Sequence, residues 1–155
     1  MGRQKDEPSD SLEWELYRTV HPGDLLRTIA LMPPPHSIVF LEGLSIAPAV
    51  AEVYQRLQVK AKRQIPSDYV DARPATYHLP ATPGALNELA ALFDMREDHE
   101  EVADHLKLYG SHGVLFAWHD VGRGGWPMLL SDRMDKELVR IIRKTHKLAL
   151  TRLPK

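Results

Sequence analysis

Residues 105–130 read HLKLYGSHGVLFAWHDVGRGGWPMLL, and this stretch decides the fold. Polar and apolar residues alternate over 105–109, as they do in a strand that exposes one face. A glycine-rich turn at 110–113 follows, and residues 114–119 are then apolar on both faces, which is typical of a central strand. A second glycine-rich turn leads to a further extended run over 127–130. The stretch therefore predicts an antiparallel meander of three strands in the C-terminal half of the chain.

Two more extended runs lie upstream of this meander. Residues 37–41 read SIVFL, a β-branched apolar run that suits a strand buried on both faces. The turn and helical pattern that follow it are the opening of a β-α-β unit. A shorter run over 76–79 predicts another strand, beyond a polar, proline-containing loop at 60–74.

Apolar residues recur at helical spacing in five segments, which are residues 12–20, 24–32, 46–57, 83–93 and 136–145. Asp10 opens a sequence that resembles a capping box before the first helix, and His21-Pro22-Gly23 is expected to end that helix. Thr82 is placed to cap the fourth helix, and either Asp132 or Asp135 to cap the last.

These patterns predict the α/β class, of the mixed α+β kind. The expected architecture is a single-layer mixed sheet of about five strands, with the meander in its C-terminal half and helices packed on the sheet. Residues 10–150 are expected to form one domain. A polar, flexible N-terminal segment over 1–9 precedes it, and a basic C-terminal tail over 151–155 follows.

The composition is that of a globular protein: of 155 residues, 43% are hydrophobic and 26% are charged. The chain has no cysteine, which excludes disulfides, thiol catalysis and cysteine-based zinc or iron–sulfur sites and fits a reducing compartment. The polar start of the chain does not resemble a secretory signal, and no apolar run reaches the roughly 18 residues needed to span a bilayer. We therefore expect a soluble, cytoplasmic protein that does not engage a membrane.

The charge is nearly balanced but unevenly distributed. A formal net charge of −1 gives no basic surplus for binding nucleic acid. Residues 88–104 carry an acidic belt, and residues 136–155 carry a basic segment. The acidic belt comprises Glu88, Asp94, Glu97, Asp98, Glu100, Glu101 and Asp104; the basic segment comprises Lys136, Arg140, Arg143, Lys144, Lys147, Arg152 and Lys155. The two can be solvated faces, or can meet within one molecule, between two copies or with a protein partner.

Residues 43–47, GLSIA, have the layout of a nucleophile elbow, with Ser45 between a buried strand and a helix. A sharp turn there would expose the hydroxyl at a helix N-terminus, where backbone N–H groups stabilise an oxyanion. His119 is a candidate base and His78 another, although neither gives a good match to the usual order of serine, acid and histidine. In the alternative interpretation, Ser45 only caps the helix and Gly43 only permits the turn.

A second candidate set consists of Glu42, His119 and Asp120. If the strands that carry them run parallel, all three lie at carboxyl ends, where open α/β sheets bind ligands. An imidazole with two carboxylates can hold a divalent metal that keeps open positions. Polar residues also end most strands simply because the chain emerges into water there. No other feature predicts a cofactor, and the sequence as a whole favours none.

Weaker signals lie nearby. His99 and His105 are six residues apart, so they do not form a zinc-protease helix, which needs a spacing of four. Arg123 lies in a glycine-rich turn that precedes no helix and so is not a phosphate loop, but it can contact a partner. Trp126 is a candidate exposed anchor for a protein partner, whereas Trp118 is expected to fill the core.

Two functional hypotheses follow. The first is a protein-binding or interaction module that self-associates through the acidic belt and the basic segment, with Arg123 and Trp126 as binding residues. The alternative is a small hydrolase or metal-dependent enzyme with Ser45, His119 and Asp120 as its catalytic residues. The enzyme hypothesis needs Ser45 or Glu42 at the same sheet edge as His119.

Overall fold

The computed structural model describes residues 10–17, 19–123 and 126–154, so the segment 1–9 predicted to be flexible lies outside the described residues. The helices are α1 (Pro22–Ala30), α2 (Pro48–Leu57), α3 (Pro83–Asp94), α4 (Lys136–His146) and the short 3-10 helix η2 (His99–Glu101). The strands are β1 (Trp14–Tyr17), β2 (Ile38–Gly43), β3 (Ala75–Pro80), β4 (His105–Gly110), β5 (Gly113–His119), β6 (Met128–Leu130) and β7 (Ala149–Arg152).

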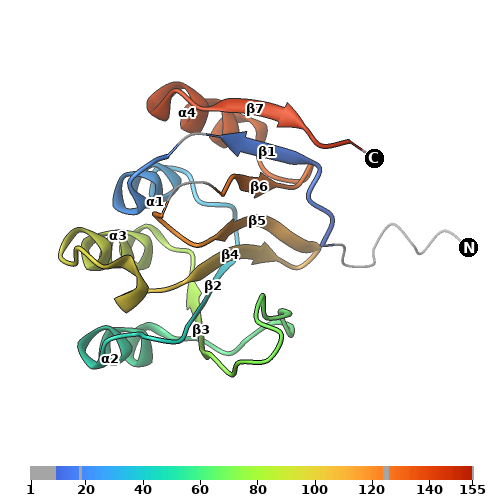
Figure 1. The fold of residues 1–155 in the computed structure, drawn as a ribbon. Coiled ribbons are helices and arrows are strands. Elements are labelled where there is room, and N and C mark those ends of the chain that lie inside the picture. The colour runs from blue at the N-terminus through green and yellow to red at the C-terminus, as the bar shows by residue number, and fades with distance from the viewer. Residues whose placement is uncertain (1–9, 18, 124–125, 155) are drawn as a thin grey trace, which may run out of the picture.

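The strands form one sheet in the order β3-β2-β4-β5-β6-β1-β7 (Figure 1). The α+β class and the meander β4-β5-β6 are confirmed. Within the described residues the sheet has seven strands instead of about five, and every pairing in it is antiparallel instead of mixed.

The prediction that residues 37–41 open a parallel β-α-β unit is wrong. β3 runs antiparallel to β2, and the first residue of β3, Ala75, pairs with the last residue of β2, Gly43. The physical reason is the long connection at 58–74. The chain leaves the C-terminal end of β2 and runs back along the sheet in α2, and the connection then returns it to that same end of β2, where β3 begins. The same segment places the acidic side chain of Asp68 beside the sheet.

The predicted helix over 12–20 is also wrong, because residues 14–17 form β1 between β6 and β7. His21-Pro22-Gly23 begins α1 instead of ending a helix: the His21 side chain accepts the N–H of Gly23, and Pro22 occupies the first turn. The strand β7 was not predicted, and it includes Thr151 and Arg152 of the expected C-terminal tail. Thr82 and Asp135 cap α3 and α4, as the sequence indicates.

The helices cover only one face of the sheet. Buried residues of α1, α2, α3 and α4 share one cluster with Leu106, Phe116 and Trp118, so Trp118 is a core residue as predicted. A smaller cluster on the other face includes Phe40 and Ile65, where residues 58–74 cover β2 and β4. Figure 1 shows α1, α2 and α3 on the left of the sheet and this segment, in green, on the right. No helix among the described residues combines the length and the apolar character needed to cross a bilayer.

Candidate functional site

Three polar side chains form a row across neighbouring strands on the face that the helices leave open. Glu42 of β2 pairs with His105 of β4, and His105 pairs with His119 of β5. Both β2 and β5 run antiparallel to β4, so they run parallel to each other and end at the same edge of the sheet. The structure therefore places Glu42, His119 and Asp120 at one edge, the condition that the enzyme hypothesis needs.

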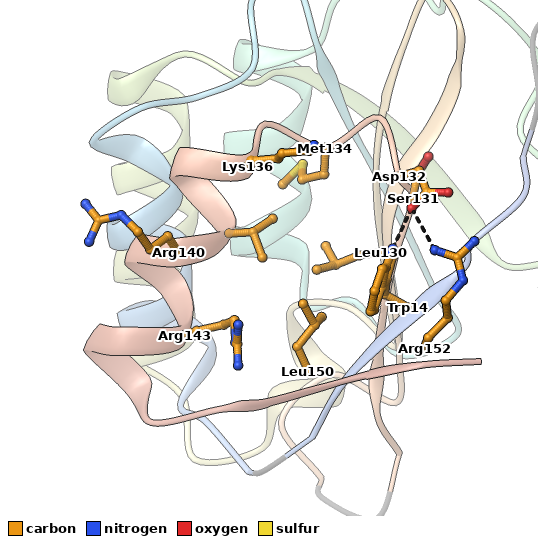
Figure 2. Close-up of a pocket in the computed structure, with 11 residues that line it drawn as sticks. Trp14, Leu130, Ser131, Asp132, Met134, Lys136, Arg140, Arg143, Leu150 and Arg152 are labelled. Atoms are coloured by element: carbon orange, nitrogen blue, oxygen red, sulfur yellow. Dashed lines mark hydrogen bonds and ion pairs between the residues drawn. The ribbon is translucent and has the colours of Figure 1, made fainter. Parts of the chain in front are cut away.

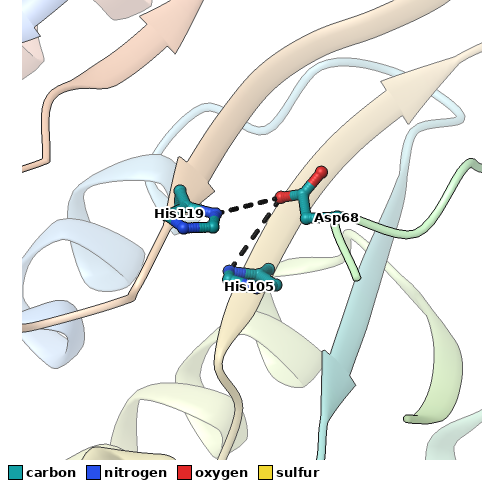
Figure 3. A group of neighbouring side chains, drawn as sticks. All are labelled: Asp68, His105 and His119. Carbon is teal, nitrogen blue, oxygen red and sulfur yellow. Dashed lines mark hydrogen bonds and ion pairs between the residues drawn. The ribbon is translucent and has the colours of Figure 1, made fainter. Parts of the chain in front are cut away.

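Asp68, from the segment 58–74, lies against this row (Figure 3). Its Oδ2 atom is 3.4 Å from Nδ1 of His119 and 3.9 Å from Nδ1 of His105. Its Oδ1 atom accepts a 2.9 Å bond from Nζ of Lys107, and its backbone N–H donates a 2.8 Å bond to Oε1 of Glu42. The bonds to Lys107 and Glu42 thus hold a loop carboxylate beside two imidazoles.

His119 lies between two carboxylates. Beyond Asp68 at Nδ1, its Nε2 atom is 3.6 Å from Oδ2 of Asp120. The ring stacks on His105 with centroids 4.0 Å apart, and it packs against Trp126 in a T-shaped arrangement with centroids 4.7 Å apart. The His119 side chain is 38% exposed, so a molecule from solvent can reach it while its neighbours hold the ring in place.

His105 is buried beneath this site. The backbone N–H of Asp120 donates to its Nδ1 atom at 3.2 Å, so the neutral ring carries its proton on Nε2. Burial, and next the charge of His119, lower the pKa of His105 below the ordinary value, against the opposing effect of nearby carboxylates. Asp120 adopts the left-handed region at φ 50°, a conformation that few residues other than glycine tolerate. This turn directs the N–H of Asp120 toward His105 and its carboxylate toward His119.

The carboxyl group of Asp68 favours its charged form. Burial raises its pKa, but the hydrogen bond and charge of Lys107 and the hydrogen bond with His119 outweigh burial and hold the pKa below the ordinary value. Tyr69 shows the opposite shift: burial and the hydrogen bond that its hydroxyl donates to Asp104 raise the pKa of the phenol well above its ordinary value. The site therefore combines a carboxylate and a phenol that stays protonated.

These side chains border a pocket of about 330 Å³ that opens to solvent. Its lining consists of Leu44, Ser45, Asp68, Tyr69, Glu100, Asp104, His105, His119, Asp120 and Arg123. Four carboxylates thus face one guanidinium, and that guanidinium is itself paired with Glu100. The pocket is acidic, which favours neutral or cationic molecules. Both binding residues predicted from the sequence lie here, Arg123 in the lining and Trp126 against His119.

Ser45 lines the same pocket, but without the geometry of a nucleophile elbow. The helix α2 begins at Pro48 with Ala47 as its N-cap and no side-chain capping bond, so the expected capping role of Ser45 is wrong. Ser45 is not among the described residues that have a positive φ. Its exposed hydroxyl makes no hydrogen bond to a described residue, His119 included. The other candidate base, His78, is bonded to Tyr109 at 2.8 Å and does not line the pocket.

Among the described residues, the group that could hold a metal ion is Asp68, His105 and His119, which shares only His119 with the set predicted from the sequence. Ligand-type atoms of Asp68, His105 and His119 lie within 4.8 Å of one another, but two ligands with bonds of about 2.0–2.1 Å to one ion are at most about 4.2 Å apart. In addition, an imidazole binds a metal in its own plane, and two rings that stack 4.0 Å apart at 12° share no such point. The Nδ1 lone pair of His105 is also occupied by the Asp120 N–H. In this arrangement, Asp68 and His119 suit proton transfer better than metal binding.

Glu42, which the sequence predicts as a metal ligand, lies beneath Asp68. It is fully buried, its Oε1 atom accepts the Asp68 N–H, and its Oε2 atom is the buried side-chain atom without a hydrogen-bond partner in the described part of the chain. Sequence reasoning missed Asp68 and His105 as site residues. His105 was within reach, because the predicted hairpin places it near His119; Asp68 lies in a polar loop without any periodic signal.

Searches with protein-family models, curated proteins and solved structures found no match to this chain.

Proposed function

We propose that the chain is a small hydrolase in which His119 is the general acid–base. The observation that carries this proposal is the 3.4 Å approach of Asp68 Oδ2 to Nδ1 of His119 in a pocket open to solvent. A carboxylate at one ring nitrogen fixes the tautomer and stabilises the imidazolium that forms when the other nitrogen takes a proton.

Asp68 is suited to the positioning role. Lys107 and the N–H bond to Glu42 hold it, and its pKa is lowered, so a carboxylate faces the imidazole near neutral pH. With the proton on Nδ1 bound to Asp68, His119 presents the lone pair of Nε2 on the side of Asp120. His119 then removes a proton from water as the water oxygen bonds to the carbonyl carbon. When the bond to the leaving group breaks, the imidazolium returns the proton to that group.

Water is the favoured nucleophile, because Ser45 forms no hydrogen bond with His119 in this arrangement. Ser45 remains the alternative, since its hydroxyl lines the same pocket. The acidic lining favours substrates that carry an amine, such as esters of amino acids, over anionic substrates.

The hypothesis of a self-associating interaction module stays a prediction. Four acids of the acidic belt, Glu88, Asp94, Glu100 and Glu101, form ion pairs within the chain, each with an arginine outside the basic segment. Because these acids are already paired within the chain, the acidic belt has less unpaired charge with which to bind a second copy. Sedimentation at low and high salt tests the hypothesis, because a charge-driven dimer dissociates as salt rises.

The hydrolase proposal is tested with glycine ethyl ester as a cationic substrate and 4-nitrophenyl acetate as a neutral one. H119Q should lower kcat/KM by about 100-fold or more, the usual contribution of a general acid–base. His112, exposed on the hairpin, gives the matched control H112Q, which should leave the rate unchanged. D68N should lower kcat with little change in KM, because Asp68 acts through His119. Wild-type rates no higher than those of H119Q would contradict the proposal, and a loss of activity in S45A would make serine the nucleophile.

A further inference from the structure

A second pocket lies on the other side of the sheet, between α4 and the strands β1, β6 and β7 (Figure 2). It has a volume of about 450 Å³, which is within the usual range for small-molecule sites, about 300–1,000 Å³. Its strand residues Trp14, Leu130 and Leu150 lie on the face that the helices cover, whereas His119 lies on the opposite face. This pocket is therefore separate from the proposed hydrolase site.

The interior of this pocket is apolar. Trp14, Leu130, Met134, Val139 and Leu150 supply its carbon surface. The indole of Trp14 is held in place from two sides. Its Nε1 atom donates to Oδ1 of Asp132 at 2.5 Å, and the guanidinium of Arg152 lies over its ring at 5.0 Å. The pocket thus contains a fixed aromatic wall against which an apolar ligand can pack.

The rim is cationic: Lys136, Arg140, Arg143 and Arg152 line it, against one acid, Asp132. Two of these cations have a partner in the chain, since Arg140 pairs with Glu137 and Arg152 with Asp132. The guanidinium of Arg143 has no ion pair or hydrogen bond to any residue in the described part of the chain. Figure 2 shows it directed toward Leu150 and the pocket, whereas the guanidinium of Arg140 points away.

We infer that this pocket binds a small amphiphile with a carboxylate head group. The apolar body of such a ligand packs against Trp14 and the neighbouring aliphatic side chains, and its carboxylate pairs with Arg143, whose forked guanidinium matches a carboxylate. A concave pocket of this volume suits a small molecule better than the convex side chains of a second protein.

The test compares octanoate, octan-1-ol and octylammonium, which share one chain and differ in the charge of the head group. Their affinities are measured by isothermal titration calorimetry on the full chain. Octanoate should bind. The affinity for octanol should be at least about tenfold lower, which is the factor expected when a charge-assisted hydrogen bond is lost, and the affinity for octylammonium should be lower still. R143Q should raise the Kd for octanoate about tenfold or more.

Lys144 provides the matched control, because it is the exposed neighbour of Arg143 on α4 and does not line the pocket. K144Q removes the same charge and should leave the octanoate Kd unchanged, as should H119Q on the opposite face. Equal affinity for octanol and octanoate, equal effects of R143Q and K144Q, or no octanoate binding at millimolar concentrations would each overturn the inference. An octanoate affinity that falls as protein concentration rises would also overturn it, because a second copy would then occupy the pocket. Unchanged hydrolase activity in R143Q separates this site from the proposed function.

Discussion

His105 and His119 lie face to face across β4 and β5, with ring centroids 4.0 Å apart and planes 12° apart. A β-bulge creates this pairing. Tyr109 pairs with Val114 next to the turn, but Leu108 pairs with Phe116, so the register moves by one residue at this point. Without that shift Trp118 would pair with His105, and the side chain of His119 would lie on the other face of the sheet. The bulge therefore brings two histidines and Asp68 into one site.

The stacked pair leads to a first prediction: H119Q raises the pKa of His105. Burial and the charge of His119 both lower that pKa, so replacing His119 removes one of the two causes. Burial remains as the cause that lowers the pKa, against the carboxylates that raise it. NMR titration of the ring proton of His105 measures the shift, with H112Q as the control. An unchanged pKa of His105 in H119Q would mean that the two rings do not interact in solution.

A second prediction concerns stability and pH. Burial lowers the pKa values of His78, His99, His105 and His146 below 6.5. Between the lowered pKa and 6.5, the unfolded chain binds more protons than the folded chain. The free energy of unfolding should therefore be highest above 6.5 and fall as the pH decreases through this window. Urea unfolding followed by circular dichroism at about pH 7.5 and about pH 5 measures it, and equal stability at the two values would contradict the prediction.

The same measurement has an internal control. H146Q should weaken the pH dependence, because it removes one histidine whose pKa burial lowers in the folded state, and glutamine can still form a hydrogen bond with Thr28, as Nε2 of His146 does at 2.8 Å. H112Q should leave the dependence unchanged, since His112 is exposed.

Local signals predicted much of the fold. The cap of α3 follows from Thr82 and Pro83 alone, and the hairpin between β4 and β5 follows from its glycines, because these residues favour one local conformation. The N-terminal strand β1 did not follow. Leu12, Trp14 and Leu16 fit both the helical spacing and the alternation of a strand, and pairing with β6 and β7 decided between them.

The candidate site could be predicted only in part. Glu42, His119 and Asp120 end strands that were recognised from their apolar runs, and the sheet brings them to one edge. Asp68 reaches the site through the path of a long loop, and no periodic pattern determines such a path. The facing of His105 and His119 depends on the bulge, which is a tertiary feature of the sheet.

A third prediction tests the core of the helix-covered face. Phe116 on β5 is fully buried in the main cluster, and F116A should cost about 3–5 kcal/mol of the free energy of unfolding, because it removes a packed ring and leaves a cavity. L31A is the control: Leu31 is 76% exposed, so its loss should change stability by at most about 0.5 kcal/mol. Urea unfolding measures both variants. A loss in F116A similar to that in L31A would place Phe116 outside the core.

The last prediction concerns the backbone of Asp120, which lies at φ 50°. A Cβ atom makes this left-handed conformation unfavourable by roughly 1–2 kcal/mol, and the cost is lowest for asparagine and aspartate. D120A and D120G both remove the carboxylate and both keep the N–H that bonds to His105, so they differ only in the Cβ atom. D120G should therefore be the more stable of the two by about 1 kcal/mol, although glycine usually destabilises a chain. D120N should keep the stability of the parent chain while it removes the charge beside Nε2 of His119. Urea unfolding of the three variants measures this order, and D120A at least as stable as D120G would show that residue 120 does not hold the left-handed conformation in solution.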